Sequence, residues 1–191
     1  MALSCVVNAA VFVFACWAVY RHICNGAQKT VFRFYTTLSN LFCAAVCLAV
    51  AVSRIIGEVP PLILVLKYIS TVSVTVTFMT VMLYLGPILY SYKDMLSGPD
   101  IWLHLICPVL AIVSLLLWDK IEMPFAAVFL GALPVLVYGC FYLYHVNLAP
   151  ADKRWDDFYG FNRTGRWPIN FGLMLVKTMP LIPWLRLLRH F

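Results

Sequence analysis

The sequence predicts an all-α integral membrane protein, a bundle of six transmembrane helices in a single domain of 191 residues. First, the chain is 63% hydrophobic and only 12% charged, with a mean hydropathy of +0.90, which is far more apolar than an average soluble domain. Second, its apolar stretches reach about 20 residues, the length that a helix needs to cross the hydrocarbon core. Third, the open edges of strands are excluded from lipid, so the Val- and Thr-rich stretch 71–77 is also predicted to be helical.

The first three spans are expected at residues 3–23, 31–56 and 62–90. The first span lacks the basic leading segment and the small-residue cleavage site of a removable signal peptide. Pro60 and Pro61 separate the second span from the third, because proline interrupts helices. In the third span, hydroxyl groups recur on one helix face at steps of three and four residues: Ser70, Ser73, Thr77, Thr80 and Tyr84.

The last three spans are expected at residues 100–118, 125–145 and 169–188. Asp100 follows a Ser-Gly-Pro turn and is a suitable N-cap for the fourth span. A polar loop, residues 147–170, separates the fifth span from the sixth, and its aromatic side chains suit the headgroup level of a membrane. We expect this loop to cover the site described below with four aromatic residues: Trp155, Phe158, Tyr159 and Phe161.

The charges of the chain indicate membrane topology rather than nucleic-acid binding. The net charge is +6, but the basic residues lie at the ends of apolar runs and not in one polar patch. An even number of spans puts both termini on one side, and eight basic residues on the opposite face against five on the terminal face place the opposite face in the cytoplasm. The seven cysteines include no Cys-x-x-Cys, so the sequence predicts no disulfide framework, no metal site and no cofactor.

Thr36 and His104 form the candidate catalytic pair. They begin the second and fourth spans, which start on the same, cytoplasmic face. With Arg33 and Asp100 as markers of the interface, both residues lie about 5–6 Å below it, at a rise of 1.5 Å per residue. A threonine hydroxyl needs a base beside it to act as a nucleophile, and histidine is a frequent base. We therefore expect the two side chains to face one cavity.

Other polar residues on this face are candidates for supporting the pair. Asn40 lies one turn deeper than Thr36 and is a candidate oxyanion donor, on a small, polar stripe that Cys43 and Cys47 continue. Asp100 lies four residues before His104 and is a candidate to hold the imidazole. His145 ends the fifth span on this face, as a supporting or an interfacial residue. Three basic residues are candidates for binding a substrate carboxylate: Lys177, Arg163 and Arg166.

Two other interpretations of these residues remain open. Serine and threonine are common in membrane helices because small hydroxyls pack closely and form hydrogen bonds between helices, so Thr36 is also compatible with a packing role. In a non-enzymatic protein, such as a small transporter, a channel subunit or a scaffold, the third-span hydroxyls and Lys177 would line a polar path. If Thr36 and His104 both line one pocket, an enzyme is favoured over a packing role or a non-enzymatic membrane protein.

Two short motifs connect the chain to a known family: Phe34-Tyr35-Thr36-Thr37-Leu38-Ser39-Asn40 and Leu103-His104-Leu105-Ile106-Cys107-Pro108. With six expected spans and an aromatic, glycine-containing loop before the last span, the chain resembles the androgen-induced-gene-like family. Some eukaryotic members of that family are intramembrane threonine hydrolases that cleave fatty acid esters of hydroxy fatty acids. The resemblance implies that Thr36 is the nucleophile, that His104 is its base, and that the substrate is a lipid or lipid-like ester.

The resemblance has further implications and two departures. The compact length is similar to the bacterial branch of the family, which implies a bacterial plasma membrane. The eukaryotic motif has one more residue between its histidine and its proline than this chain has between His104 and Pro108. Family members are also drawn with both termini in the cytosol, opposite to the orientation that the charges predict here.

Overall fold

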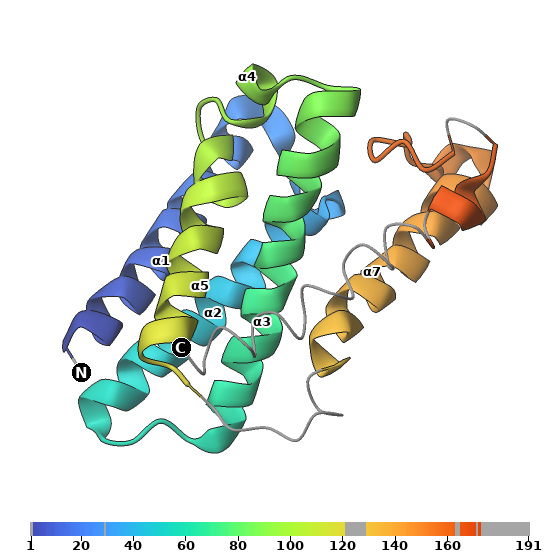
Figure 1. Ribbon diagram of the computed structural model, residues 1–191. Helices are drawn as coiled ribbons and strands as arrows, with labels where there is room; N and C mark the ends of the chain where they lie inside the picture. Colours follow the sequence, from blue (N-terminus) through green and yellow to red (C-terminus); the bar gives the residue numbers. More distant parts are fainter. Residues whose placement is uncertain (1, 29, 121–128, 163–164, 171, 173–191) are drawn as a thin grey trace.

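The computed structural model is helical, with no strand in the part of the chain that it describes (Figure 1). The structure describes residues 2–28, 30–120, 129–162, 165–170 and 172. Its α-helices are α1 (Ala2–His22), α2 (Tyr35–Ile56), α3 (Pro61–Thr80), α4 (Tyr92–Met95), α5 (Cys107–Leu117) and α7 (Leu133–Leu143). Short 3-10 turns are η2 (Val31–Arg33), η5 (Phe129–Ala132) and η7 (Ala151–Lys153). Wider π-helical segments are η1 (Ile23–Ala27), η3 (Val81–Leu89), η4 (Trp102–Ile106) and η6 (Tyr144–Leu148).

Four continuous helices are long and apolar enough to cross a membrane: Ala2–Ala27, Tyr35–Ile56, Pro61–Leu89 and Phe129–Leu148. They coincide with the first, second, third and fifth predicted spans, so the prediction of an all-α fold is confirmed, and four of the predicted spans have the length and composition of membrane-crossing helices. The fourth predicted span forms the apolar helix Trp102–Leu117, which is shorter than the other four. The sixth predicted span falls almost entirely outside the described residues. Six crossings therefore stay a prediction.

Large apolar side chains on the outer faces of these helices fit contact with lipid. Examples on three different helices are Val13 at 55% exposure, Leu83 at 69% and Val137 at 61%. A soluble monomer seldom exposes so many large apolar residues, because contiguous apolar surface in water favours association. The exposure of large apolar side chains therefore fits helices that have the length and the hydropathy needed to cross a membrane.

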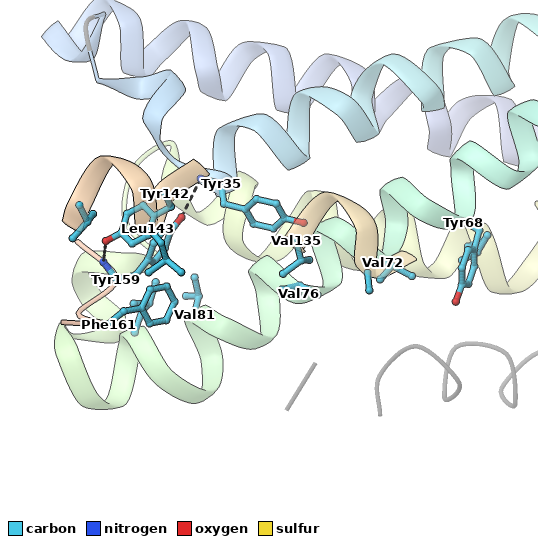
Figure 2. Close-up of a cluster of buried hydrophobic side chains, with 14 residues drawn as sticks. Tyr35, Tyr68, Val72, Val76, Val81, Val135, Tyr142, Leu143, Tyr159 and Phe161 are labelled. Atoms are coloured by element: carbon cyan, nitrogen blue, oxygen red, sulfur yellow. Dashed lines mark hydrogen bonds between the residues drawn. The ribbon is translucent and has the colours of Figure 1, made fainter. Parts of the chain in front are cut away.

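Helices α1, α2, α3 and α5 lie side by side in one bundle, and α7 packs outside it against α3 (Figure 1). One buried cluster fills the space between α1, α2 and η4–α5, around Val11, Ala15, Cys47 and Leu103. A second, richer in aromatic residues, joins α3 and η3 to α7 and the loop after it (Figure 2). The contact is close at Gly131, where an added Cβ would lie 2.9 Å from Cγ2 of Val72. Glycine lets η5 approach α3 at this point.

A buried polar network connects the helices at the end of the bundle opposite to Thr36. The Lys67 ammonium donates to Oδ1 of Asn8 at 2.7 Å and to Sγ of Cys47 at 2.9 Å. Asn8 in turn donates to Oδ2 of Asp119 at 2.9 Å, and Arg54 pairs with Oδ1 of that carboxylate at 3.1 Å. Our charge count placed Lys67 on the terminal face of the membrane. That assignment stays a prediction, and the structure adds that the Lys67 side chain is fully buried between helices.

Candidate active site

Thr36 and His104 line the same cavity, which has a volume of about 280 Å³. The cavity lies where the start of α2 and the start of η4 meet, beneath the loop after α7. Its other lining residues include His22, Phe34, Thr37, Tyr90, Met95, Phe158 and Tyr159. The two residues thus share one cavity, whereas a hydrogen-bonding distance between their side chains and a role for either residue in catalysis stay predictions.

Thr36 is placed by the way in which α2 begins. Phe34 is extended at the N-cap position, and Tyr35 and Thr36 are the first two residues of the helix. The first backbone N–H groups of a helix have no partner within the helix and carry its positive end. Here the N–H of Tyr35 donates to the phenolic oxygen of Tyr159 at 3.0 Å. Thr36 therefore lies at the positively polarised start of α2, next to a backbone N–H whose hydrogen bond Tyr159 already accepts.

His104 lies in the π-helical turn η4, four residues before Pro108. Proline has no N–H to donate to the carbonyl of His104, so a regular α-helical hydrogen bond is lost there and the wider turn is tolerated. Nδ1 of His104 lies 2.6 Å from the carbonyl oxygen of Met95. A carbonyl only accepts hydrogen bonds, so Nδ1 carries the proton, and Nε2 of the neutral ring has the free lone pair. This is the tautomer that a general base requires.

Asp100 does not hold the imidazole of His104, contrary to our expectation. One of its carboxylate oxygens lies 3.1 Å from Nε2 of His22, at the end of α1. The Met95 carbonyl takes the position beside His104 instead, because the chain turns back after α4 and brings Met95 over η4. Asp100 does line the cavity, where it contributes negative charge to the wall.

Asn40 ties the two halves of the site together. Its Nδ2 donates to the carbonyl of Thr36 at 2.8 Å and to the carbonyl of Leu103 at 3.0 Å. Both amide hydrogens are therefore used, and the side chain is not free to donate to an oxyanion, as we had expected. Because both neighbours are acceptors, the orientation of the amide is fixed. Asn40 supports the site by holding α2 against the residue that precedes His104. Cys43 and Cys47 are buried with it, as the stripe predicted.

A second, smaller cavity adjoins the first one at Thr36. Most of its wall is apolar or aromatic and comes from α2, α3, η3 and α7: Tyr35, Val76, Val81, Val135, Tyr138 and Phe161. Thr36, Leu85 and Tyr159 line both cavities. Thr36 therefore lies between two chambers. The more polar one contains His104, and the apolar one lies inside the helix bundle.

The loop after α7 covers both cavities, in part as predicted. Phe158 and Tyr159 line the cavity of Thr36 and His104, and Tyr159 and Phe161 line the apolar one. The carboxylate of Asp157 holds the loop, since it accepts hydrogen bonds from the Tyr142 hydroxyl at 2.7 Å and from the backbone N–H groups of Phe161 and Asn162. Figure 2 shows Tyr142, Tyr159 and Phe161 gathered at one end of the aromatic cluster.

Trp155 and His145 form a separate contact at the edge of this loop. Their rings are stacked, with centroids 4.3 Å apart, and the Arg33 guanidinium lies 5.3 Å from the centre of the indole. Neither ring lines either cavity, although we had expected Trp155 to cover the site and had considered His145 as a supporting or an interfacial residue. Their place is the base of the loop, where they fix it to α7 and η6.

Of the basic residues predicted to bind a carboxylate, only Arg166 lies within the described residues. It is exposed and lines neither cavity. Arg163 and Lys177 lie outside the described residues. Among the residues that the structure describes, no three His, Cys, Asp or Glu side chains gather where they could hold a metal ion.

The buried hydroxyls of α3 point to packing rather than to a polar path. Four of them donate to carbonyls three or four residues earlier in the same helix: Ser70 to Lys67, Ser73 to Ile69, Thr75 to Thr71 and Thr77 to Ser73. A hydroxyl bound in this way satisfies its own hydrogen-bonding need inside the helix. Thr77 also contacts the hydroxyl of Ser39 on α2 at 3.0 Å, so these groups join helices.

Sequence reasoning missed two residues of the site. Thr37 lines the cavity of His104 together with Thr36, although a step of about 100° around the helix separates them. Both residues nevertheless line this cavity, which extends over two adjacent positions at the start of α2. Tyr159 was expected only to cover the site, yet its hydroxyl bonds to the first turn of α2. No local pattern predicts a contact across 124 residues of sequence.

Comparisons of the chain with protein-family models, with curated proteins and with solved structures found no match. The resemblance to the androgen-induced-gene-like family therefore rests on the two sequence motifs, both of which contribute residues to the cavity.

Proposed function

We propose that the chain is an intramembrane hydrolase of lipid esters in which Thr36 is the nucleophile and His104 is its base. The observation that carries this proposal is the shared cavity: a hydroxyl at the positive end of a long helix and an imidazole with a free Nε2 open into one chamber within a membrane protein. A nucleophile is activated only by a base that can reach it, and these residues are 68 positions apart in sequence.

The reaction would proceed in two halves. The Thr36 hydroxyl attacks the ester carbonyl and gives its proton to Nε2 of His104, and the tetrahedral intermediate then releases the alcohol, which takes that proton. Water, deprotonated by the same nitrogen, then attacks the acyl carbonyl, and the acid leaves as that proton returns to the Thr36 oxygen. The Met95 carbonyl holds the ring and stabilises its charged form between these steps.

The two adjoining cavities support an amphipathic substrate. The apolar chamber next to Thr36 has a volume of about 30 Å³, so it admits only a small apolar group of the substrate among Val76, Val81 and Val135, where apolar side chains replace water around that group. The larger chamber with His104 and Asp100 can hold the more polar part of an ester. Thr36 lies between them, next to the position where the ester bond would be.

The deciding experiment is labelling of the purified protein with a fluorophosphonate probe, together with hydrolysis of long-chain esters in detergent. We expect labelling and hydrolysis to be abolished in Thr36→Ala and in His104→Ala. Because nucleophile and base act as a unit, the double variant should be hardly worse than either single one. Thr75→Ala is the control, since Thr75 is a buried threonine of a neighbouring helix that lines neither cavity.

Thr37→Ala decides which of the two adjacent threonines reacts, because Thr37 shares the cavity with His104 but not the apolar one. We expect Thr37→Ala to remain labelled. If Thr36→Ala folds and keeps its labelling, Thr36 has a packing role, and a non-enzymatic membrane protein, such as a scaffold or a small transporter subunit, is the better description.

A further inference from the structure

Tyr159 reaches Thr36 from a distant part of the chain. It belongs to the loop after α7, where its N–H donates to the Tyr142 hydroxyl at 3.1 Å, and it is buried down to 9% exposure. Its phenolic oxygen accepts the N–H of Tyr35 at 3.0 Å, and dashed lines in Figure 2 mark both bonds. The hydroxyl is thus held against the first turn of α2, beside Thr36, on the wall that both cavities share.

The hydroxyl of Tyr159 keeps its proton and can donate it in a hydrogen bond. Burial raises the pKa of Tyr159 to about 12, although hydrogen bonds with Tyr35, Tyr138 and Thr36 partly offset the effect of burial. The phenol therefore stays neutral over the range in which an esterase works. Because its oxygen accepts from the backbone of Tyr35, the O–H can rotate toward Thr36 or toward a substrate oxygen.

The site needs such a donor. A carbonyl oxygen gains negative charge as the carbonyl carbon is attacked, and donors that are already in place when this charge develops stabilise the transition state. The sequence suggested Asn40 for this role, but both of its amide hydrogens are bound to backbone carbonyls. Tyr159 has the O–H group, the burial and the fixed position that the role requires.

We propose that Tyr159 is a third catalytic residue, which donates its O–H to the carbonyl oxygen of the bound ester. This inference rests on the proposed ester hydrolase function. As the bond between Thr36 Oγ and the carbonyl carbon forms, the π electron pair moves to the oxygen and the Tyr159 hydrogen bond stabilises it. The Thr36 proton goes to His104. When the intermediate collapses, the electron pair returns, the bond to the alcohol breaks, and Tyr159 keeps its proton throughout.

Tyr159→Phe removes only the hydroxyl and tests the inference. We expect kcat to fall about 100-fold with little change in KM, as for the loss of one oxyanion donor. Tyr92→Phe is the matched control, because the Tyr92 hydroxyl is also hydrogen-bonded to the backbone, where it donates to the carbonyl of Met82, but Tyr92 lines neither cavity. Its kcat should be unchanged.

A transition-state mimic distinguishes a catalytic role from a structural one. A long-chain trifluoromethyl ketone forms a tetrahedral adduct with an oxyanion, whereas the corresponding ether binds without one. Tyr159→Phe should weaken binding of the ketone by about the same factor as kcat/KM falls, and it should leave binding of the ether unchanged. Equal weakening of both ligands would overturn the inference and leave Tyr159 as a structural residue.

A second variant covers the case in which Tyr159→Phe does not fold. Replacing Tyr159 by 3,5-difluorotyrosine keeps the hydroxyl and makes it more acidic. Activity should then fall at a lower pH on the alkaline side than in the natural protein, because an ionised phenol cannot donate. An unchanged alkaline limb would overturn the inference.

The failure of this inference can be distinguished from failure of the proposed function. Activity that is lost in Thr36→Ala and fully retained in Tyr159→Phe removes only Tyr159 from the mechanism. Activity that is retained in Thr36→Ala, or absent from the natural protein with every ester, removes the proposed function and this inference together.

Discussion

Asn40 donates a hydrogen bond from its side chain to the backbone carbonyl of Leu103 at 3.0 Å. Leu103 immediately precedes His104, and the same amide nitrogen holds the carbonyl of Thr36 at 2.8 Å. One side chain in α2 therefore sets the distance between the two residues that the proposed mechanism requires to meet. Hydrogen bonds of this kind determine how helices are rotated against one another, because few other polar groups are present inside a membrane protein.

The Asn40 contact predicts a loss of activity larger than the loss of stability. Asn40→Leu keeps the volume of the side chain but removes both hydrogen bonds, so we expect hydrolysis to fall at least 10-fold as His104 moves relative to Thr36. The free energy of unfolding should fall by only about 0.5–2 kcal/mol. Thermal unfolding in detergent and ester hydrolysis measure the two effects. A drop in stability with unchanged hydrolysis would contradict the positioning role.

The loop after α7 should depend on one carboxylate. Asp157→Ala removes the acceptor of three hydrogen bonds, so residues 155–162 should detach from the cavities, and the backbone amides of Phe161 and Asn162 should exchange hydrogen much faster. Hydrogen exchange and limited proteolysis measure this effect. Asp156→Ala is the control, since the Asp156 side chain is exposed, and it should leave exchange unchanged. Equal exchange in both variants would show that ring packing alone orders the loop.

The buried charges at the other end of the bundle should determine stability but not chemistry. Asp119 accepts hydrogen bonds from Ser4, Asn8 and Arg54. Asp119→Ala therefore removes the negative charge that compensates Arg54 and the buried Lys67 in this network. We expect the free energy of unfolding to fall by about 3 kcal/mol or more. Glu58→Ala, at an exposed acidic residue, should have no measurable effect. At temperatures where Asp119→Ala is folded, its hydrolytic rate should be normal. A normal melting temperature would contradict the importance of the network.

The contact between η5 and α3 predicts a compensating pair of variants. Gly131→Ala places a methyl group 2.9 Å from Val72, which should cost about 1–3 kcal/mol of stability through overpacking. Combining it with Val72→Ala should recover part of that loss, because the new methyl group fills the space that the valine vacates. Gly57→Ala is the control, since an added Cβ there meets nothing within 4 Å. Additive losses in the double variant would show that the two residues are not in contact.

The sequence could predict that Thr36 and His104 lie close together, because in a membrane bundle the position of a residue along the membrane normal follows from its place in the span. The number of membrane crossings before each residue gave its expected membrane face, and the rise of 1.5 Å per residue gave its expected depth below that face. The shared cavity agrees with the expectation that the two residues meet, whereas their membrane face and depth stay predictions. The same method could not predict that Lys67 is buried, since counting assigns a residue to a depth but not to the lipid side or the protein side of its helix.

The sequence by itself determined the helical class and the approximate bounds of four long apolar helices, and it predicted that Thr36 and His104 meet, because hydropathy and helical rise are local properties of the chain. Only the tertiary structure decided the partners. Met95, rather than Asp100, holds the imidazole, Asn40 is bound to backbone carbonyls, and Tyr159 reaches the first turn of α2. Each of these contacts depends on how a helix is rotated about its axis or on the path of a loop. Packing between distant segments sets both, and no spacing within a single span specifies them.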